Sequence, residues 1–525
     1  MEWMTNSIGR TIPKEIDGRR LKGFTGIFAS NTDDHHDDNN SERKFVTRTA
    51  ASAIQRGPIN KVVNSWDELF ERLQPKSGMT ISFHHHLRNG DLMINEVMTR
   101  LAARGLSDLV VTPTALFPTH DKLAELIKTG VISHIDGSLS GQMGMACSRG
   151  LMKRTAILRS HGGRYRAIQS GDLPIDIAFI AAPTADTMGN ANGVTGKSAC
   201  GPILYSLPDS LFARQVVVLT DNLVPYPCFP WSIQGGNVDW VLPVESLGDP
   251  AKIAGKTSRI TKSPTQLLIA ELTARFIEES GIMRPGYSFH ADADDISVAT
   301  TGFLSARMKE KGVKASFIHG GATIILVDLL NNKLTDYLMD IQSFDPEAMR
   351  SLRDNPRHVE SSPFISYCQN ARGCLAHQLD AAILGATEID LDFNVNVNTS
   401  SDGFLLYGTG GHSDAAAGSG CTIIAAPSFS KRVPLIREKV TTVSTPGEAI
   451  DILVTERGIA INPRRSDLLD RVKSTDLPII PLPQLMKQVN EITGIPDAPR
   501  LGERPVALVE WRDGTILDVV REVIG

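Results

Sequence analysis

Hydrophobic and polar positions alternate strictly in the segment "EIDLDFNVNVN", residues 388–398. Apolar side chains occupy every second position from Ile389 to Val397, and carboxylates or amides lie between them. Because successive side chains of a β-strand point to opposite faces, the alternation predicts one strand with a buried apolar face and a polar face. The polar face is either simply wet or one wall of a functional site, and the pattern alone leaves both interpretations open.

From residue 66 onwards, short apolar runs alternate with stretches of helical period, which is typical of βα units and a mostly parallel sheet. One order of elements occurs twice, starting at "ISFHHHLRNGD" (Ile81) and at "YSFHADADDIS" (Tyr287). Each copy has an apolar strand ending in Ser-Phe-His, a loop, a helix, a glycine (Gly105 or Gly312) and a second apolar strand. This internal repeat predicts an α/β fold of two tandem domains with mostly parallel sheets.

We place a polar N-terminal arm at residues 1–65, the first domain at 66–245 and the second at 246–525, with the Gly-, Pro- and Ser-containing stretch "ESLGDPAKIAGKTSRITKSP" as the connector. The "DDHHDD" run of the arm is interpreted as a solvated charge run, because the fixed spacing and turn glycine of a hard-cation loop are missing. Near the end of the second domain, "VALVEWRDGTILDVV" predicts a hairpin that turns at Asp-Gly.

Composition narrows the class of protein. The 525 residues carry a net charge of -5, which argues against a general nucleic-acid or anionic-membrane surface. The six cysteines are scattered without a Cys-x-x-Cys pair, which favours a reducing compartment over disulfides or structural zinc. The chain begins without a signal-peptide core, and no apolar run approaches about twenty residues. We therefore expect a cytoplasmic protein that binds neither membrane nor nucleic acid.

Ligands of doubly wound sheets bind beyond the carboxyl ends of the strands, so the loop after the first Ser-Phe-His is a candidate site. Three consecutive histidines of a strand cannot all ligate one metal, because neighbouring side chains point in opposite directions. We interpret His84, His85 and His86, with Arg88 and Asn89, as donors for a carboxylate or phosphate. Packing of the histidines at a domain interface is the alternative.

Two further segments place small residues where the backbone bends or approaches a ligand. "RSHGGR" contributes Ser160 and His161, and "GNANG" contributes Asn190, all as candidate substrate-binding residues. Each signal is weak alone, because Gly-Asn runs also form ordinary turns.

The segment "GTGGH" forms a glycine-rich loop soon after the strand that begins at Glu388. Backbone N–H groups at Gly410 and Gly411 are candidates for binding an oxyanion, and Gly408 for contact with a thioester arm. His412 directly after them is a candidate substrate-binding residue. A carboxylate near oxyanion donors is what acyl transfer from a thioester to a carboxylic acid requires.

Taken together, these segments resemble the citrate lyase alpha subunit family of the coenzyme A transferase superfamily. The resemblance runs from about Lys76 to the C-terminus and rests on ten blocks in order: "ISFHHHLRNGD", "SHGGR", "IQSGDLPIDIAFI", "GNANG", "GDPAKIA", "DIQSFDPEAMRSL", "EIDLDFNVNVNTSSDG", "GTGGHSDAA", "STPGEAIDILVTERGIAINPRR" and "TGIP".

The resemblance implies two tandem coenzyme A transferase-like domains with the active site between them. It implies exchange of the acetyl group of a carrier-protein thioester for citrate, giving citryl thioester and acetate. A beta subunit then releases oxaloacetate, and a gamma subunit is the acyl carrier protein. The implied assembly is an oligomer without a tightly bound cofactor or metal; acetyl-CoA or the phosphopantetheine-type arm of the carrier is a substrate.

For individual residues, the resemblance places Glu388 where related coenzyme A transferases have a nucleophilic glutamate, and residues 408–411 on their glycine loop. Citrate lyase alpha subunits are thought instead to let the bound carboxylate attack the thioester directly. Positioning of the two reactants can then lower the activation barrier by roughly 7–11 kcal/mol without a covalent residue. Glu388 as nucleophile, as orienting residue and as a purely structural residue all remain open at this point.

The sequence departs from the family pattern after the second Ser-Phe-His, where Asp292, Asp294 and Asp295 replace an expected glycine-rich loop. We expect these carboxylates to face the thioester or carrier arm, whose phosphates they would repel. Altered carrier recognition, a cation site and a weakened enzyme are the open interpretations.

Two alternatives to the citrate transferase follow. The chain could be a related acyl transferase acting on citramalate or malonate, or a hydrolase if water replaces the acceptor. It could also be a catalytically impaired paralogue that serves as a binding or scaffold subunit, which the aspartate-rich segment favours.

Overall fold

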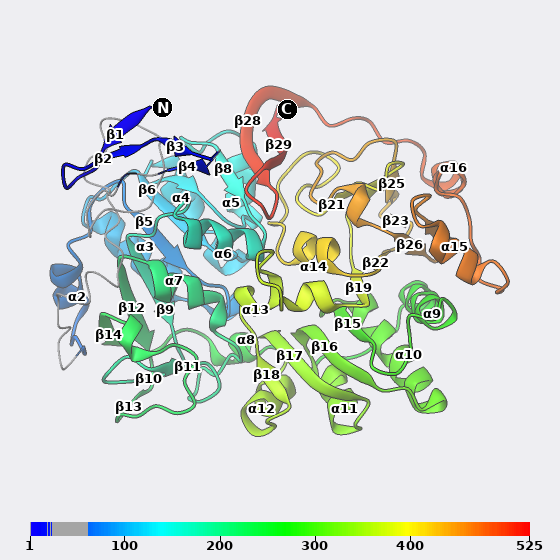
Figure 1. Cartoon of the computed structure of the whole chain (residues 1–525), viewed down its shortest axis with the longest axis horizontal. Coiled ribbons are helices and arrows are strands. Elements are labelled where there is room, and N and C mark those ends of the chain that lie inside the picture. Colours follow the sequence, from blue (N-terminus) through cyan, green and yellow to red (C-terminus); the bar gives the residue numbers. More distant parts are fainter. Residues whose placement is uncertain (1, 18, 22, 24–60, 525) are drawn as a thin grey trace.

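The computed structural model describes residues 2–17, 19–21, 23 and 61–524. Within this part of the chain, two α/β halves lie side by side, each built around a mostly parallel sheet (Figure 1). The Asp33–Asp38 cluster of the predicted arm lies outside the described residues. Among the described residues, no helix is long and apolar enough to cross a membrane.

The sheet of the first half has six parallel strands in the order β14-β12-β9-β5-β6-β7. Its core is built from runs such as "VVVL" in β12, whose side chains are fully buried, as expected for a parallel sheet covered on both faces. The strands are β5 (Thr80–Phe83), β6 (Leu109–Pro113), β7 (Ile132–Ile135), β9 (Ile177–Ala181), β12 (Gln215–Thr220) and β14 (Trp240–Pro243).

The sheet of the second half has the order β18-β17-β16-β15-β19-β22-β26-β27 and is parallel except for β27 at its edge. Its strands are β15 (Ser288–Ala291), β16 (Ala315–Ala322), β17 (Thr335–Ser343), β18 (His358–Glu360), β19 (Ala381–Leu384), β22 (Thr422–Ala425), β26 (Ile452–Thr455) and β27 (Gly458–Ile461). Without its edge strands β18 and β27, this sheet has the order β17-β16-β15-β19-β22-β26. In chain order that is 3-2-1-4-5-6, as in the first sheet, so the internal repeat and the predicted fold class are confirmed.

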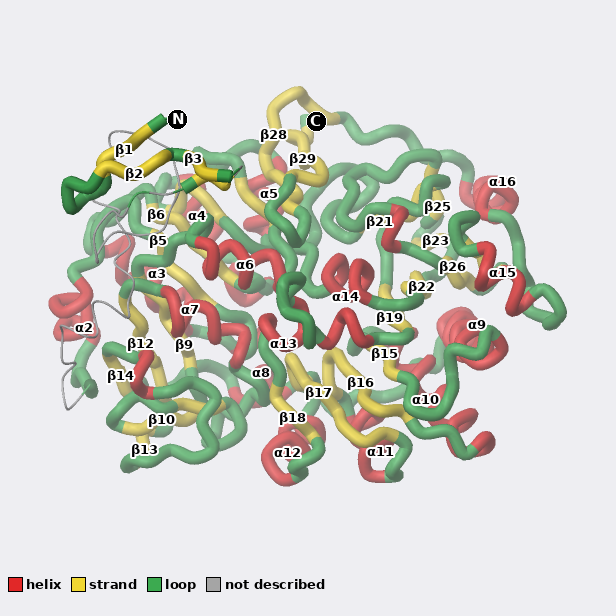
Figure 2. The backbone as a smooth tube through the Cα atoms, in the orientation of Figure 1, coloured by secondary structure: helices red, strands yellow, loops and turns green. Residues whose placement is uncertain are grey.

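Helices surround both sheets (Figure 2). In the second copy of the repeat, α10 begins where Asp294 caps its N-terminus and ends at Gly312, whose φ of 64° suits glycine. The helices are α2 (Trp66–Leu73), α3 (Met93–Ala103), α4 (Leu123–Lys128), α5 (Gly141–Ser148), α6 (His161–Ser170), α7 (Leu207–Phe212), α8 (Pro250–Ala254), α9 (Pro264–Glu279), α10 (Asp295–Lys311), α11 (Ile324–Asn331), α12 (Pro346–Asp354), α13 (Pro363–Tyr367), α14 (His412–Gly418), α15 (Ser466–Val472) and α16 (Leu482–Thr493).

The alternating segment 388–398 is not one strand, so that prediction was wrong. It forms β20 (Glu388–Asp390) and β21 (Val395–Asn396), paired antiparallel across a turn. The Asp390 carboxylate accepts hydrogen bonds from the backbone N–H groups of Asp392 and Asn394, which reverses the chain. Most of the polar set is buried as well, namely Glu388, Asp390, Asn396 and Asn398, whereas Asp392 in the turn is exposed.

The first half repeats this hairpin. Asp186 accepts from the N–H groups of Met188 and Asn190 between β10 (Thr184–Asp186) and β11 (Ala191–Asn192). The two small sheets are completed by β13 (Leu223–Val224) and β25 (Ile436–Arg437), respectively. The "GNANG" and "FNVNVN" blocks are therefore the same structural element in the two copies.

The C-terminal hairpin packs on the first half of the chain. Strands β28 (Leu501–Glu510) and β29 (Ile516–Val523) pair as predicted, and β28 also pairs with β8 (Ala156–Leu158) of the first half. Val506 and Val509 of β28 lie in the hydrophobic core of the first half. The hairpin, assigned above to the second domain, therefore packs on the first; the domain boundaries themselves stay predictions.

Short strands complete the described structure. The N-terminal pairs are β1 (Trp3–Thr5) with β2 (Thr11–Pro13) and β3 (Glu15–Ile16) with β4 (Arg19–Arg20), and β23 (Phe429–Ser430) pairs with β24 (Val433–Pro434) in the second half.

Candidate active site between the two halves

The two halves meet where "SHGG" of the first lies against "GTGG" of the second. The backbone N–H of His161 donates to Gly410 O at 2.9 Å, and Ser160 pairs with Gly410 as an isolated parallel bridge. A Cβ added to Gly410 would lie 3.8 Å from His161 Nε2. Two segments that the sequence analysis selected independently, about 250 residues apart, are therefore in direct contact.

Three rings of the first half gather at this contact. The His85 ring stacks on that of His161 with centroids 5.4 Å apart, and Tyr205 lies 4.4 Å from the first and 4.6 Å from the second. His85 lies just beyond the carboxyl end of β5, where doubly wound folds bind ligands, and the ring of His161 at the start of α6 stacks against it there.

The second half contributes Tyr367 at the end of α13. Its ring centroid is 6.4 Å from that of His161, and its hydroxyl lies against the glycine loop, because a Cβ on Gly411 would come within 2.6 Å of the oxygen. Among the described residues, none accepts a hydrogen bond from the hydroxyl of Tyr205 or Tyr367. Two phenol donors from different halves thus remain available to a ligand.

Burial keeps these groups uncharged. Desolvation lowers the pKa of His161 to about 3 and holds the pKa of His85 well below its usual range. It also raises the pKa of Tyr205 and Tyr367, so both phenols keep their protons. The histidines were predicted above as donors for an anion; the structure makes them neutral donors, each with one N–H, rather than cations.

The aspartate-rich segment separates into three different environments. Asp292 hydrogen-bonds His290 Nε2 at 3.1 Å, and His290 Nδ1 in turn lies 2.9 Å from Nδ1 of His319. Burial opposes ionisation of Asp292, but the hydrogen bond from His290 and the electrostatic interaction with the neighbouring histidines lower its pKa overall. Its side chain is 48% exposed, so this carboxylate stays charged and reaches solvent.

The other two aspartates have structural positions. Asp294 accepts from the N–H groups of Ile296 and Ser297 as the cap of α10, and Asp295 is exposed in the first turn of that helix. In the described part of the chain, no group of three or more His, Cys, Asp or Glu side chains is arranged to hold a metal ion. The contact of all three with a thioester arm stays a prediction.

Glu388 lies in a buried polar network. Its carboxylate accepts from Asn396 Nδ2 at 2.9 Å and from the backbone N–H of Thr441 at 2.8 Å, and Arg437 Nε is 3.4 Å away. The side chain is fully buried. Both oxygens therefore already have partners, which favours the structural interpretation that the sequence left open.

Several other predicted residues point elsewhere. His84 faces Asp209, with 3.9 Å between Nε2 and Oδ1, and His86 Nε2 bonds Ala181 O at 2.5 Å. Asn190 lies in its own turn, where it accepts from Gly235 N. The remaining positions are as follows: the Arg88 guanidinium bonds Ile253 O, Asn89 is exposed, Gly408 N bonds Ser138 Oγ, and His412 bonds Thr445 and the Gly385 carbonyl.

Comparison with known proteins identifies the family of this chain. A family model described as "Citrate lyase, alpha subunit (CitF)" matches residues 59–523. Citrate lyase alpha chains of Klebsiella pneumoniae and Haemophilus influenzae are 43% and 42% identical over 464 residues, which is 88% of this chain and 91% and 93% of theirs. The chain belongs to the citrate lyase alpha subunit family.

A solved citrate lyase alpha subunit from Streptococcus mutans, crystallised in complex with citrate, has the same fold. It is 41% identical, the TM-score is 0.87, and the match covers 89% of this chain and 92% of that one. The family resemblance found from the ten sequence blocks is therefore confirmed over most of the chain.

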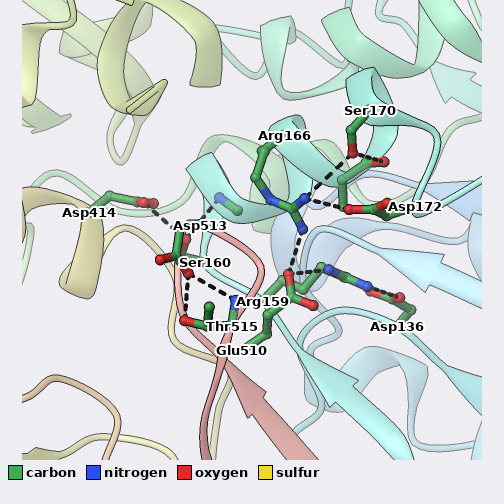
Figure 3. Close-up of polar contacts among 12 residues, drawn as sticks. Asp136, Arg159, Ser160, Arg166, Ser170, Asp172, Asp414, Glu510, Asp513 and Thr515 are labelled. Atoms are coloured by element: carbon green, nitrogen blue, oxygen red, sulfur yellow. Dashed lines mark hydrogen bonds and ion pairs between the residues drawn. The ribbon is translucent and has the colours of Figure 1, made fainter. Parts of the chain in front are cut away.

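In this member of the citrate lyase alpha family, sequence reasoning missed several residues of the site: Tyr205, Tyr367, His290, His319 and Asp414. Asp414 accepts from Ser160 Oγ at 2.9 Å and from Gly162 N at 2.8 Å, so it links the two halves (Figure 3). Asp414 could have been selected from the sequence, because it lies only three residues after Gly411 of the glycine-rich loop. The tyrosines lie in ordinary apolar contexts that gave none.

Proposed function

We propose that this chain transfers an acyl group between thioester and carboxylate: acetyl thioester plus citrate gives citryl thioester plus acetate. The observation that carries the proposal is the meeting of neutral donors from both halves, namely His161, Tyr205 and Tyr367, at the Gly410–Gly411 loop. Membership in the citrate lyase alpha family supports citrate as the acceptor.

The chemistry requires no net proton transfer. A citrate carboxylate oxygen attacks the acetyl carbonyl carbon, and the thiolate leaves with the C–S bond electrons. The thiolate then attacks the citryl carbonyl of the mixed anhydride, and acetate leaves. Each addition places negative charge on a carbonyl oxygen, which fixed neutral donors in a water-poor site stabilise strongly.

We further propose that the chain works in a complex with the other subunits of a citrate lyase, with the acetyl group carried on an acyl carrier protein and with acetyl-CoA as a substitute. The support is the family alone, whose members are named as alpha chains.

The deciding experiment incubates the purified chain with acetyl-CoA and labelled citrate. Citryl-CoA and one equivalent of acetate are the expected products, separated by chromatography. With citramalate or malonate supplied in place of citrate, formation of their CoA thioester when citrate gives none would change the acceptor. Thiol release without any acceptor would indicate a hydrolase. No reaction of folded protein with any of these acids would contradict the enzyme proposal.

Glu388→Gln is expected to keep the exchange rate within about tenfold of the parent, because the structure commits Glu388 to Asn396, Thr441 and Arg437. Loss of a true catalytic nucleophile costs about 10⁴-fold or more. The measurement is kcat for citryl-CoA formation, with circular dichroism as the check of folding.

Chemical trapping gives the complementary readout. Hydroxylamine or borohydride added during turnover should leave Glu388 unmodified by mass spectrometry. Stoichiometric modification at Glu388, or a 10⁴-fold loss in a folded Gln variant, would establish the covalent route instead.

A further inference from the structure

The turn of the C-terminal hairpin enters the boundary between the two halves and contacts both. Glu510, the last residue of β28, forms an ion pair with Arg159, whose guanidinium also bonds Asp136 with 2.7 Å between Nε and Oδ1 (Figure 3). Arg159 directly precedes Ser160 and His161. The hairpin thereby fixes the first-half segment of the site from one side.

Two residues later, Arg512 contacts the second half. Its Nη2 donates to Tyr367 O at 2.9 Å and its Nη1 to Asp414 O at 3.4 Å, while its Nε lies 3.7 Å from Asp414 Oδ1. The residue is 4% exposed, so this positive charge is held in the interior. Among the described residues, Nε has no hydrogen-bond partner, which leaves the Asp414 carboxylate as its nearest compensation.

Asp414 in turn binds the first half, because its two carboxylate oxygens accept hydrogen bonds from Ser160 Oγ and Gly162 N. Ser160 Oγ in turn caps α6 by accepting from Gly163 N at 2.9 Å. A continuous chain of contacts thus runs from the hairpin to the helix that begins with His161.

We propose that Arg512 is a positioning residue for the transfer reaction, which holds Tyr367 and Asp414 so that the His161 and Gly410–Gly411 segments stay in register. The inference rests on the proposed function for its reaction and on the contacts above for its geometry. Arg512 touches backbone carbonyls and a carboxylate, so it acts through other residues and is not itself a catalytic group.

The pKa of Asp414 provides a measurement that would not change if Arg512 had only a structural role. Burial raises the pKa of Asp414 to about 6, and the Arg512 charge and the bonds from Gly162 and Ser160 oppose that rise. The ionised form accepts both first-half hydrogen bonds, so activity is expected above this pKa and is lost as the pH falls through it. The other titratable or charged groups that face Asp414 or Arg512 are Tyr205, Tyr367, Cys374 and His377.

The experiment compares the pH profiles of kcat/KM for citryl-CoA formation in the full chain. In Arg512→Gln the pKa of Asp414 rises further, so the acid limb should move upward by about one pH unit, the effect of losing one nearby opposite charge. We also expect kcat to fall by about 10²-fold, as for a small misplacement of reacting groups.

Arg512→Lys separates charge from geometry. The ammonium restores the acid limb toward its original position, but it cannot bond both carbonyls with the fork of a guanidinium, so kcat stays low. Arg504→Gln is the matched control: Arg504 lies on the same hairpin and bonds two carbonyls, of Gly150 and Met152, away from Asp414. Its acid limb should stay in place.

A second readout does not depend on activity. Hydrogen–deuterium exchange of the peptides around residues 160–166 and 408–418 should rise in Arg512→Gln and not in Arg504→Gln. An unmoved acid limb together with unchanged exchange at both peptides overturns the inference. A parent protein that fails to form citryl-CoA contradicts the proposed function instead, and the exchange measurement then decides the positioning role alone.

Discussion

Replacement of Asp209 by alanine is expected to lower the free energy of unfolding by about 3–5 kcal/mol, the usual cost of leaving a buried partner charge uncompensated. Asp209 in α7 accepts two hydrogen bonds from Arg164 of α6, at 2.7 and 2.9 Å, and one from Ser82 of β5. Asp209 and Arg164 are both buried, at 0% and 3% exposed. Without the carboxylate, the guanidinium stays in the core, and Ser82 Oγ and Thr112 O are the partners that the described residues still offer it.

The charge state of the pair supports the size of this effect. Burial alone would raise the pKa of Asp209, but the adjacent Arg164 and His84 outweigh it and lower the pKa, so the carboxylate is ionised in the folded protein. Because α6 begins at His161, the same ion pair holds the candidate site against β5. A loss of stability should therefore come with a loss of exchange activity.

The measurement is denaturant unfolding followed by fluorescence and circular dichroism. Asp209→Asn keeps an acceptor oxygen and should lose less than the alanine variant. Asp336→Ala removes a half-exposed carboxylate of β17 that is paired with Lys314, and it should change stability by less than about 1 kcal/mol. Equal losses in Asp209→Ala and Asp336→Ala would show that the buried pair contributes no more than a surface pair.

The fold was predictable because both copies of the repeat carry the same local signals. Ser-Phe-His, a helix and the glycine at Gly105 or Gly312 follow in the same order, and both glycines adopt φ near 70° to end their helices. Side chains of parallel strands are buried on both faces, so continuous apolar runs located the sheets. Periodicity failed at 388–398, where the Asp390 carboxylate bonds the backbone and reverses the chain although the apolar alternation continues.

The candidate site was predictable only in part. Ser160, His161, Gly410 and Gly411 were selected by local chemistry, and the structure brings them together. Tyr205 and Tyr367 were not, because their role depends on which segments meet across the halves, and no period or spacing in a single sequence encodes that. Burial is equally invisible in the sequence: it neutralises His85 and His161 and gives Glu388 a full set of partners.

Tyr367→Phe is expected to lower kcat for citryl-CoA formation by about 10²–10³-fold, the range found when one donor to a developing oxyanion is removed. Phenylalanine preserves the ring that packs edge-on to His319 at 5.4 Å and near His161 at 6.4 Å. The lost hydroxyl bonds no described residue, so its removal leaves no buried group unpaired and stability should hardly change. Burial keeps the phenol protonated, so the effect should be the same across the working pH range.

The division between kcat and KM decides whether Tyr367 acts in the transition state. A donor that bonds the oxyanion and the ground-state carbonyl equally would raise KM and leave kcat unchanged, whereas one aimed at the oxyanion lowers kcat. Tyr337→Phe, which removes a half-exposed hydroxyl on β17, is the control and should match the parent protein. If Tyr367→Phe also matched the parent protein, the Tyr367 hydroxyl beside Gly411 would have no part in the chemistry. Oxyanion binding would then depend on Tyr205, His161 or the backbone of the glycine loop.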